Sequence, residues 1–98
     1  MRIFTLTIAA ARDFDLLSRH SYTHFGGEQT DRYFDQLEIT LKSLAQFPAM
    51  GRRLERKPVF IHPTQGVLVV YRENIGGIEV VRVLRGQTAI AARYLNKL

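Results

Sequence analysis

The stretch from Gly66 to Gly86 constrains the fold of this chain more than any other part of the sequence. Two runs rich in Val, Ile and Tyr, Val67–Arg72 and Ile78–Arg85, flank a short segment that ends in Gly76-Gly77. β-Branched and aromatic residues favour a packed, pleated surface. A Gly-Gly pair supplies the positive φ of a tight reversal. The stretch therefore predicts a β-hairpin.

Alternation along the two runs predicts which side chains share a face of the sheet. In the first strand, Val67, Val69 and Tyr71 alternate with Leu68, Val70 and Arg72. In the second strand, Ile78, Val80, Arg82 and Leu84 alternate with Glu79, Val81, Val83 and Arg85. Both faces are largely apolar, which is typical of strands in the centre of a sheet.

Three arginines interrupt this apolar pattern, and the sequence leaves two interpretations open. In the first, Arg72, Arg82 and Arg85 snorkel to solvent at strand ends or pair with Glu73 and Glu79. In the second, they form a basic strip on an open sheet face.

The remaining elements follow from periodicity and from the positions of Gly and Pro. A strand is expected at Arg2–Ile8, helices at Ala9–Phe25 and Glu28–Phe47, a strand at Val59–His62 and a helical turn within Gln87–Leu98. Thr7 is a plausible N-cap for the first helix, and Gly26-Gly27 separates the two helices. The expected core stripes are Ala10, Phe14, Leu17 and Phe25 on the first helix, and Thr30, Tyr33/Phe34, Leu37, Leu41 and Leu44/Ala45 on the second.

This element order, β-α-α-β-β-β, predicts the α+β class. We expect an antiparallel helix hairpin packed on a small, mainly antiparallel sheet, with a short C-terminal helical turn. A chain of 98 residues fits one domain, spanning residues 1–98.

Charge and cysteine content restrict the function. The net charge of +5 favours an acidic partner, such as nucleic acid or an acidic protein segment. The absence of cysteine excludes a disulfide framework and fits the reducing cytoplasm. The sequence contains no secretory signal pattern and no apolar run near the ~20 residues of a membrane span.

Candidate chemical sites are few. His20 and His24 share a helix face, but two histidines alone are a weak metal signal. The acidic helical stripe Asp31, Asp35 and Glu38 is a similarly weak metal signal. We expect no metal and no cofactor. The segment Pro48–Lys57 is expected to be a loop, and its Arg52, Arg53, Arg56 and Lys57 form either a phosphate- or acid-binding patch or a solvated charged loop.

Several strings in this order resemble the ParE branch of the RelE/ParE toxin superfamily of bacterial type II toxin–antitoxin systems. They are Arg12-Asp13-Phe14, Phe25-Gly26, Ala45–Arg52 with its Pro-x-x-Gly-Arg element, Val69–Arg72, and Gly77–Gly86, in which Arg85 replaces the usual histidine. The resemblance covers nearly the whole chain and implies a toxin, with a role in plasmid stabilisation.

The superfamily also contains ribosome-dependent mRNA endonucleases, and two positions separate this chain from them. Those enzymes carry an arginine early in the strand that leads to the tyrosine and another just past the glycine of the last strand. Here Leu68 and Thr88 occupy these positions. Leucine cannot stabilise a phosphorane or transfer a proton, so the resemblance favours a gyrase inhibitor without a catalytic site.

Three hypotheses remain open at this point. The first is a gyrase-inhibiting toxin neutralised by a ParD-like antitoxin, a small DNA-binding protein whose C-terminal segment wraps the toxin in a hetero-oligomer. The second is a ribosome-dependent mRNA endonuclease with a displaced basic set, formed by Arg52, Arg53, Arg82, Arg85 and Tyr94. The third is a non-toxic family member that only binds a partner. The candidate residues for antitoxin or target binding are Arg52, Arg53, Arg72, Arg82, Arg85, Arg93 and Tyr94.

Overall fold

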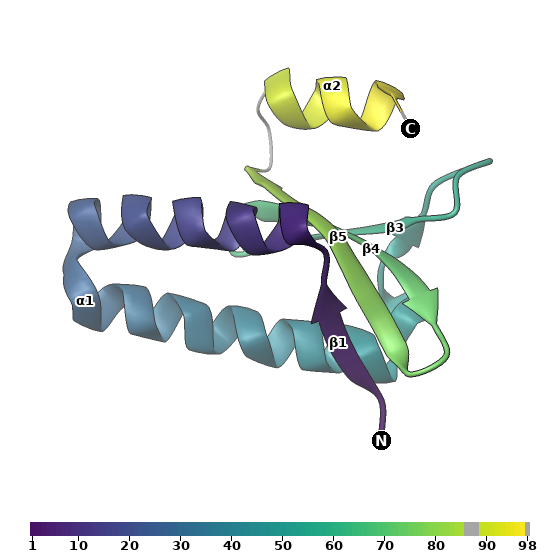
Figure 1. Ribbon diagram of the computed structural model, residues 1–98, viewed down its shortest axis with the longest axis horizontal. Helices are drawn as coiled ribbons and strands as arrows, with labels where there is room; N and C mark the ends of the chain where they lie inside the picture. Colours follow the sequence, from purple (N-terminus) through teal and green to yellow (C-terminus); the bar gives the residue numbers. More distant parts are fainter. Residues whose placement is uncertain (86–88, 98) are drawn as a thin grey trace.

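The computed structural model of the chain describes residues 1–85 and 89–97, with backbone alone for 89–92. Its elements in chain order are β1 (Ile3–Leu6), α1 (Ile8–Gln46), the 3-10 helix η1 (Pro48–Met50), β2 (Arg52–Arg53), β3 (Phe60–Thr64), β4 (Val67–Asn74), β5 (Gly77–Arg85) and α2 (Ala89–Lys97). Figure 1 shows this arrangement. The predicted α+β class is confirmed, whereas η1 and β2 occupy a segment that was expected to be a loop.

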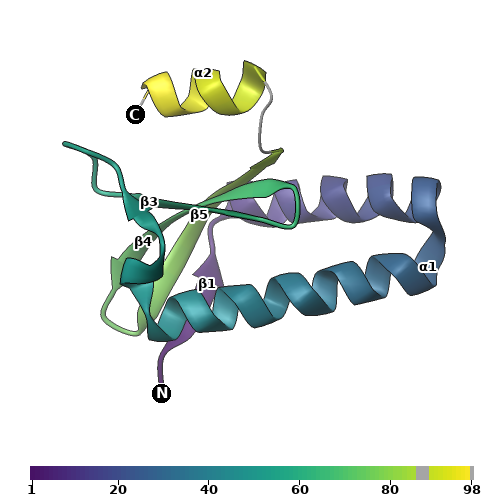
Figure 2. The ribbon, with the colours of Figure 1, turned by 180° about the vertical axis from the view of Figure 1, so that it is seen from behind.

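The helix α1 is a hairpin of two antiparallel arms (Figures 1 and 2). Its chain reverses at Gly26, where φ is 80° and ψ is 174°. The hydroxyl of Thr30 donates to the Gly26 carbonyl oxygen at 2.8 Å and lies 2.8 Å from the Ser21 hydroxyl, so the buried polar groups at the reversal satisfy one another. Thr7 caps the first arm by accepting from the Ala10 N–H at 3.1 Å. The two predicted helices and the N-cap are therefore confirmed.

The five strands form one sheet in the order β1-β5-β4-β3-β2. β1 runs parallel to β5, and the other neighbours are antiparallel. The turn from β3 to β4 has positive φ at both Gln65 (51°) and Gly66 (76°), as a type I′ hairpin turn requires. The predicted β4–β5 hairpin is present, with Ile75 and Gly76 between the paired residues Asn74 and Gly77.

A β-bulge in β5 changes the expected alternation. Tyr71 pairs with Val80 and Val70 pairs with Arg82, which leaves Val81 without a partner on β4. Beyond the bulge the faces are exchanged relative to strict alternation. Arg82 consequently lies on the face of Val70, and the face assignments predicted for β5 are wrong from Arg82 onward.

Each face of the sheet has its own cover. The α1 hairpin packs on one face, and the buried members of that cluster are Ala10, Leu37, Leu41, Leu44, Ala45, Val67, Val69, Tyr71, Ile78, Val80 and Val83. α2 covers the other face with Tyr94 and Leu95, over Val59, Ile61, Leu68, Val70 and Leu84. Figure 2 shows the two helices on opposite sides of the sheet.

One expected core position is not in the core. Phe25 is 59% exposed because it lies at the tip of the first arm, beyond the edge of the sheet. The first strand is also shorter than expected, because β1 ends at Leu6 and Ile8 is already the first residue of α1.

Tyr71 fixes the turn that follows α1. Its hydroxyl donates to the Pro48 carbonyl oxygen at 2.5 Å and accepts from the Gly51 N–H at 2.9 Å. Burial raises the pKa of Tyr71, against a lowering by the Gly51 hydrogen bond. A Cβ on Gly51 would lie 2.1 Å from that hydroxyl oxygen, so the turn requires glycine here. The Pro-x-x-Gly-Arg element therefore forms a turn whose backbone is held by hydrogen bonds to the Tyr71 hydroxyl.

Removing this phenol is expected to destabilise the fold. Tyr71→Phe leaves the Gly51 N–H and the Pro48 carbonyl without their partner, at a cost of about 1–3 kcal/mol in the free energy of unfolding. Urea denaturation measures the loss. Tyr22→Phe is the matched control because the Tyr22 side chain is 65% exposed. Equal free energies for the two variants would contradict the assigned role.

Candidate functional site

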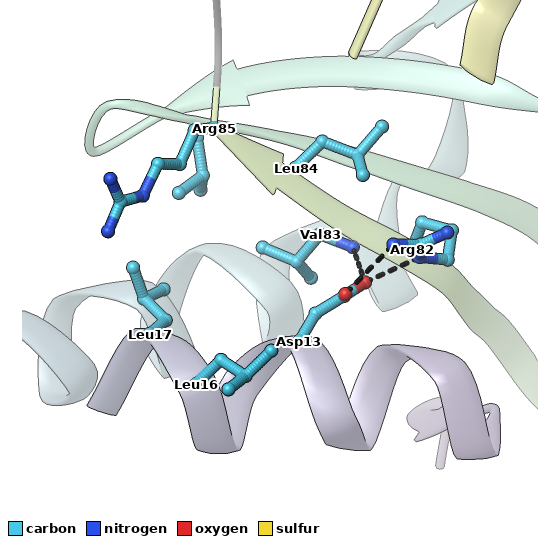
Figure 3. Close-up of a pocket in the computed structure, with 8 residues that line it drawn as sticks. Asp13, Leu16, Leu17, Arg82, Val83, Leu84 and Arg85 are labelled. Carbon is cyan, nitrogen blue, oxygen red and sulfur yellow. Dashed lines mark hydrogen bonds and ion pairs between the residues drawn. The ribbon is translucent and has the colours of Figure 1, made fainter. Parts of the chain in front are cut away.

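Two adjoining cavities lie beside the first arm of α1 and the C-terminal end of β5, and the second also reaches the second arm of α1 and the β3–β4 turn. The first, of about 260 Å³, is lined by Asp13, Leu16, Leu17, Val67, Arg82, Val83, Leu84 and Arg85 (Figure 3). The second, of about 270 Å³, is lined by Leu17, His20, Ser21, Phe25, Gln29, Tyr33, Gln65, Gly66, Val67 and Arg85. Because they share Leu17, Val67 and Arg85, we treat them as one feature, the β5 groove.

The β5 groove exists because β1 is shorter than β5. Leu6, the last residue of β1, pairs with Val80, so none of the described strands lies beside the rest of β5 on that side. The Thr7 hydroxyl donates to the Val81 carbonyl oxygen at 2.8 Å. Six residues later Asp13 Oδ2 accepts from the Val83 N–H at 2.9 Å. The α1 side chains thus satisfy backbone groups that a longer β1 would have paired.

Asp13 also binds Arg82 through two parallel hydrogen bonds (Figure 3). Arg82 Nε lies 2.7 Å from Asp13 Oδ2, and Nη2 lies 3.0 Å from Oδ1. This hydrogen bonding raises the pKa of Arg82, although desolvation opposes the shift. The guanidinium carbon also lies 5.2 Å from the centroid of the Tyr94 ring, within range of a cation–π contact. Arg82 therefore connects α1, β5 and α2.

The walls of the β5 groove combine exposed apolar surface with positive charge. Leu16 is 64% exposed and Phe25 is 59% exposed, so the groove presents apolar surface to solvent. Arg85 pairs with Val67 and so lies on the face of the sheet that the α1 helix hairpin covers. The pKa of His20 is lowered, first by desolvation and then by the charges of Arg85 and His24. Asp13 compensates the charge of Arg82 within the groove.

The structure brings together three of the seven predicted binding residues. Arg82 and Arg85 line the groove, and Tyr94 contacts Arg82. Arg93 is exposed on α2. Arg52 and Arg53 are exposed on β2, which forms the opposite edge of the sheet.

The basic strip that was one interpretation of the β4–β5 arginines is not continuous. Arg72 Nε donates to Glu79 at 2.7 Å, as the pairing interpretation predicted. Arg82 pairs with Asp13 instead of a strand glutamate, and Glu73 pairs with Arg2 at 3.3 Å.

Sequence reasoning assigned no binding role to Asp13, Leu16, Leu17 or His20. The Asp13-Phe14 string was a signal, but the partner of Asp13 is 69 residues away and no local pattern connects the two. Leu17 was expected only in the core, and Leu16 fell outside the expected stripe.

Other candidate chemistry finds little support in the described part of the chain. It contains no group of three or more His, Asp or Glu side chains that could hold a metal ion. The His20 and His24 rings stack with centroids 4.1 Å apart, and His24 Nδ1 bonds the His20 carbonyl at 2.8 Å. Leu68 is 7% exposed in the cluster beneath α2. Thr88 lies outside the described residues.

None of the helices described has the length and apolar character needed to cross a membrane.

Comparisons with known proteins agree with this fold. A family model described as "ParE toxin of type II toxin-antitoxin system, parDE" matches residues 4–90. A solved structure described as "Chromosomal ParDE TA system from P. aeruginosa" has a TM-score of 0.76 and 22% identity, with 89% of this chain and 98% of that chain covered. No curated protein sequence matches the chain.

Proposed function

The chain belongs to the ParE toxins of type II toxin–antitoxin systems, and on this premise we propose that it inhibits DNA gyrase and is neutralised by a ParD-like antitoxin. The domain, residues 1–98, acts in the bacterial cytoplasm and is held there in a hetero-oligomer with its antitoxin. It acts by binding and carries no catalytic site of its own. The observation that carries the proposal is the family match across residues 4–90.

The state of the candidate nuclease residues supports binding over catalysis. Leu68 occupies a position where the related endonucleases carry an arginine, and its side chain is buried under α2. Arg82 donates to both oxygens of Asp13. A guanidinium held in this way is poorly placed to stabilise the charge that develops on a scissile phosphate.

The β5 groove is the proposed docking site for the antitoxin. Its exposed Leu16 and Phe25 offer apolar surface, and the positively charged Arg85 lines its wall. A segment with alternating apolar and acidic side chains would bury the first and pair with the second. The groove therefore selects the acidic, partly apolar C-terminal segment proposed for the antitoxin.

The target is tested by inducing the chain in bacteria without antitoxin. Gyrase inhibition predicts growth arrest, filamentation and induction of an SOS reporter, and the purified chain should inhibit supercoiling by gyrase. An arrest with a silent reporter and with transcripts cut during translation, seen by primer extension, would reject gyrase in favour of the ribosome.

The docking site is tested by charge reversal. Arg85→Glu is expected to slow antitoxin association about tenfold and to make the rate less sensitive to salt, because a rim charge acts mainly on the association rate. Surface plasmon resonance measures both. Arg53→Glu makes the same charge change on the far edge of the sheet. If only Arg53→Glu slowed antitoxin association, the antitoxin would bind at β2 and not at the β5 groove.

A further inference from the structure

Among the described residues, no strand pairs with the outer edge of β1. β1 is the terminal strand on its side of the sheet. The Ile3 N–H donates to the Gly76 carbonyl oxygen at 2.8 Å, and the Thr7 N–H donates to that of Val80 at 3.0 Å. Since backbone groups alternate in direction along a strand, the N–H and C=O groups of Phe4 and Leu6 point away from β5. They offer two donors and two acceptors to another strand.

Exposed apolar side chains cluster around this edge. Six of the eleven exposed large hydrophobic side chains in the described residues lie on β1, beside it or in the adjoining groove: Met1, Ile3, Leu6, Ile8, Ile39 and Phe47. That groove has a volume of about 630 Å³ and lies between β1 and the second arm of α1. A contiguous apolar surface of this kind marks an interaction site.

In the part of the chain that the structure describes, β1 lacks the devices that usually protect an edge strand. Proteins shield such edges with lysine, proline, bulges or a covering segment, and β1 reads Ile-Phe-Thr-Leu. The nearest cation, Arg2, turns inward, with Nε 2.6 Å from the Ala45 carbonyl oxygen and Nη2 3.3 Å from Glu73. The edge is therefore open to pairing and carries no uncompensated charge from Arg2.

We propose that a second copy of this chain pairs with the edge of β1, antiparallel and about a two-fold axis at Thr5. In this register Phe4 lies opposite Leu6 of the second copy. Each such pair exchanges two N–H···O=C bonds, so the interface contains four. Thr5 faces Thr5 of the second copy, a favourable cross-strand pair. The two sheets become one continuous sheet.

Self-complementarity selects a second copy over another partner. Phe4 and Leu6 share a face, and antiparallel pairing sets them against each other, apolar to apolar. They line a cavity with Leu37 and Glu38, so the centre of β1 is level with the Glu38–Lys42 ion pair. The two-fold axis would set Glu38 towards Lys42 of the second copy, and opposite charges would face each other across the interface.

This interface is independent of the proposed gyrase and antitoxin interactions. The β5 groove begins where β1 ends, so pairing at the outer edge of β1 leaves it open. A dimer formed in this way presents two grooves. Each copy could then bind its own antitoxin segment.

Charge substitution at the axis tests the proposal. The full chain, purified free of antitoxin, is expected to dimerise as its concentration rises in sedimentation velocity. Thr5→Lys and Thr5→Glu should each weaken the dimer roughly fivefold or more, because each sets like charges directly opposite. An equimolar mixture of the two variants should dimerise again. Thr23→Lys, on an exposed part of α1, is the matched charge control.

Amide hydrogen exchange provides a second readout that does not depend on the variants. Protection of the Phe4 and Leu6 amides should increase with protein concentration, and circular dichroism checks that each variant is folded. A wild-type chain that stays monomeric, or variants that dimerise as well as wild type, would overturn the proposal. So would a mixture of the two folded variants that remains monomeric.

Discussion

Gly77→Ala is expected to lower the free energy of unfolding by about 3–5 kcal/mol, the range of severe core disruptions. Gly77 has φ of 145°, a conformation that residues with a side chain rarely adopt. A Cβ there would lie 1.9 Å from the carbonyl oxygen of Ile3 and 2.8 Å from its nitrogen. These are backbone atoms of β1, and they cannot move aside without breaking the parallel pairing with β5.

The neighbouring glycine is the matched control for this variant. Gly76 lies in the same turn, but a Cβ there meets nothing within 4 Å. Gly76→Ala should therefore be near neutral, since alanine only restricts the unfolded chain. In thermal denaturation Gly77→Ala should melt roughly 15–30 °C below wild type. Equal melting temperatures for the two alanine variants would mean that β1 does not pack against Gly77.

Gly77 also shows where sequence reasoning stops. The pair Gly76-Gly77 correctly predicted a reversal between two strands, because turn preference is a local property of the chain. The steric requirement at Gly77 comes from β1, whose Ile3 is 74 residues away in the chain. Only the structure shows that one glycine serves the close approach of β1 while the other tolerates a side chain.

The helices and strands were predictable because their signals are short-ranged. Thr7, Gly26 and the apolar stripe of the second arm of α1 act over one or two turns, and the structure confirms them. The parallel pairing of β1 with β5 was not predicted, since it joins the two ends of the chain. The prediction that Phe25 lies in the core was wrong for a related reason. Helical periodicity identifies a face but not how far the sheet extends beneath it.

The bulge at Val81 explains why the site was only partly predictable. Strict alternation puts Arg82 on the face of the sheet covered by α1, where its charge would be buried beside Val80. The extra residue of the bulge instead moves Arg82 to the face beneath α2, and it moves Arg85 to the face covered by α1. A run of Val and Arg contains no sequence signal for a bulge. Both arginines could therefore be identified as candidates from the sequence, but the face of the sheet on which each lies could not be predicted.

Asp13→Ala is expected to destabilise the protein by about 2–4 kcal/mol, which is large for a residue on a helix surface. The substitution removes three hydrogen bonds: two from Arg82 and one from the Val83 N–H. It also leaves the guanidinium of Arg82, whose side chain is 29% exposed, without its counter-charge. The cost should appear in urea denaturation as a lower midpoint with an unchanged slope.

A second aspartate separates this effect from the loss of any helix-surface carboxylate. Asp15 pairs with Arg19 at 3.0 Å, but the two side chains are 58% and 75% exposed. Asp15→Ala should therefore cost no more than about 0.5 kcal/mol. A double-mutant cycle of Asp13→Ala with Arg82→Ala should give a coupling energy of about 1–3 kcal/mol. Additive effects would mean that the two residues act separately. In that case Arg82 would not be held by Asp13, and the reason for excluding it from catalysis would no longer stand.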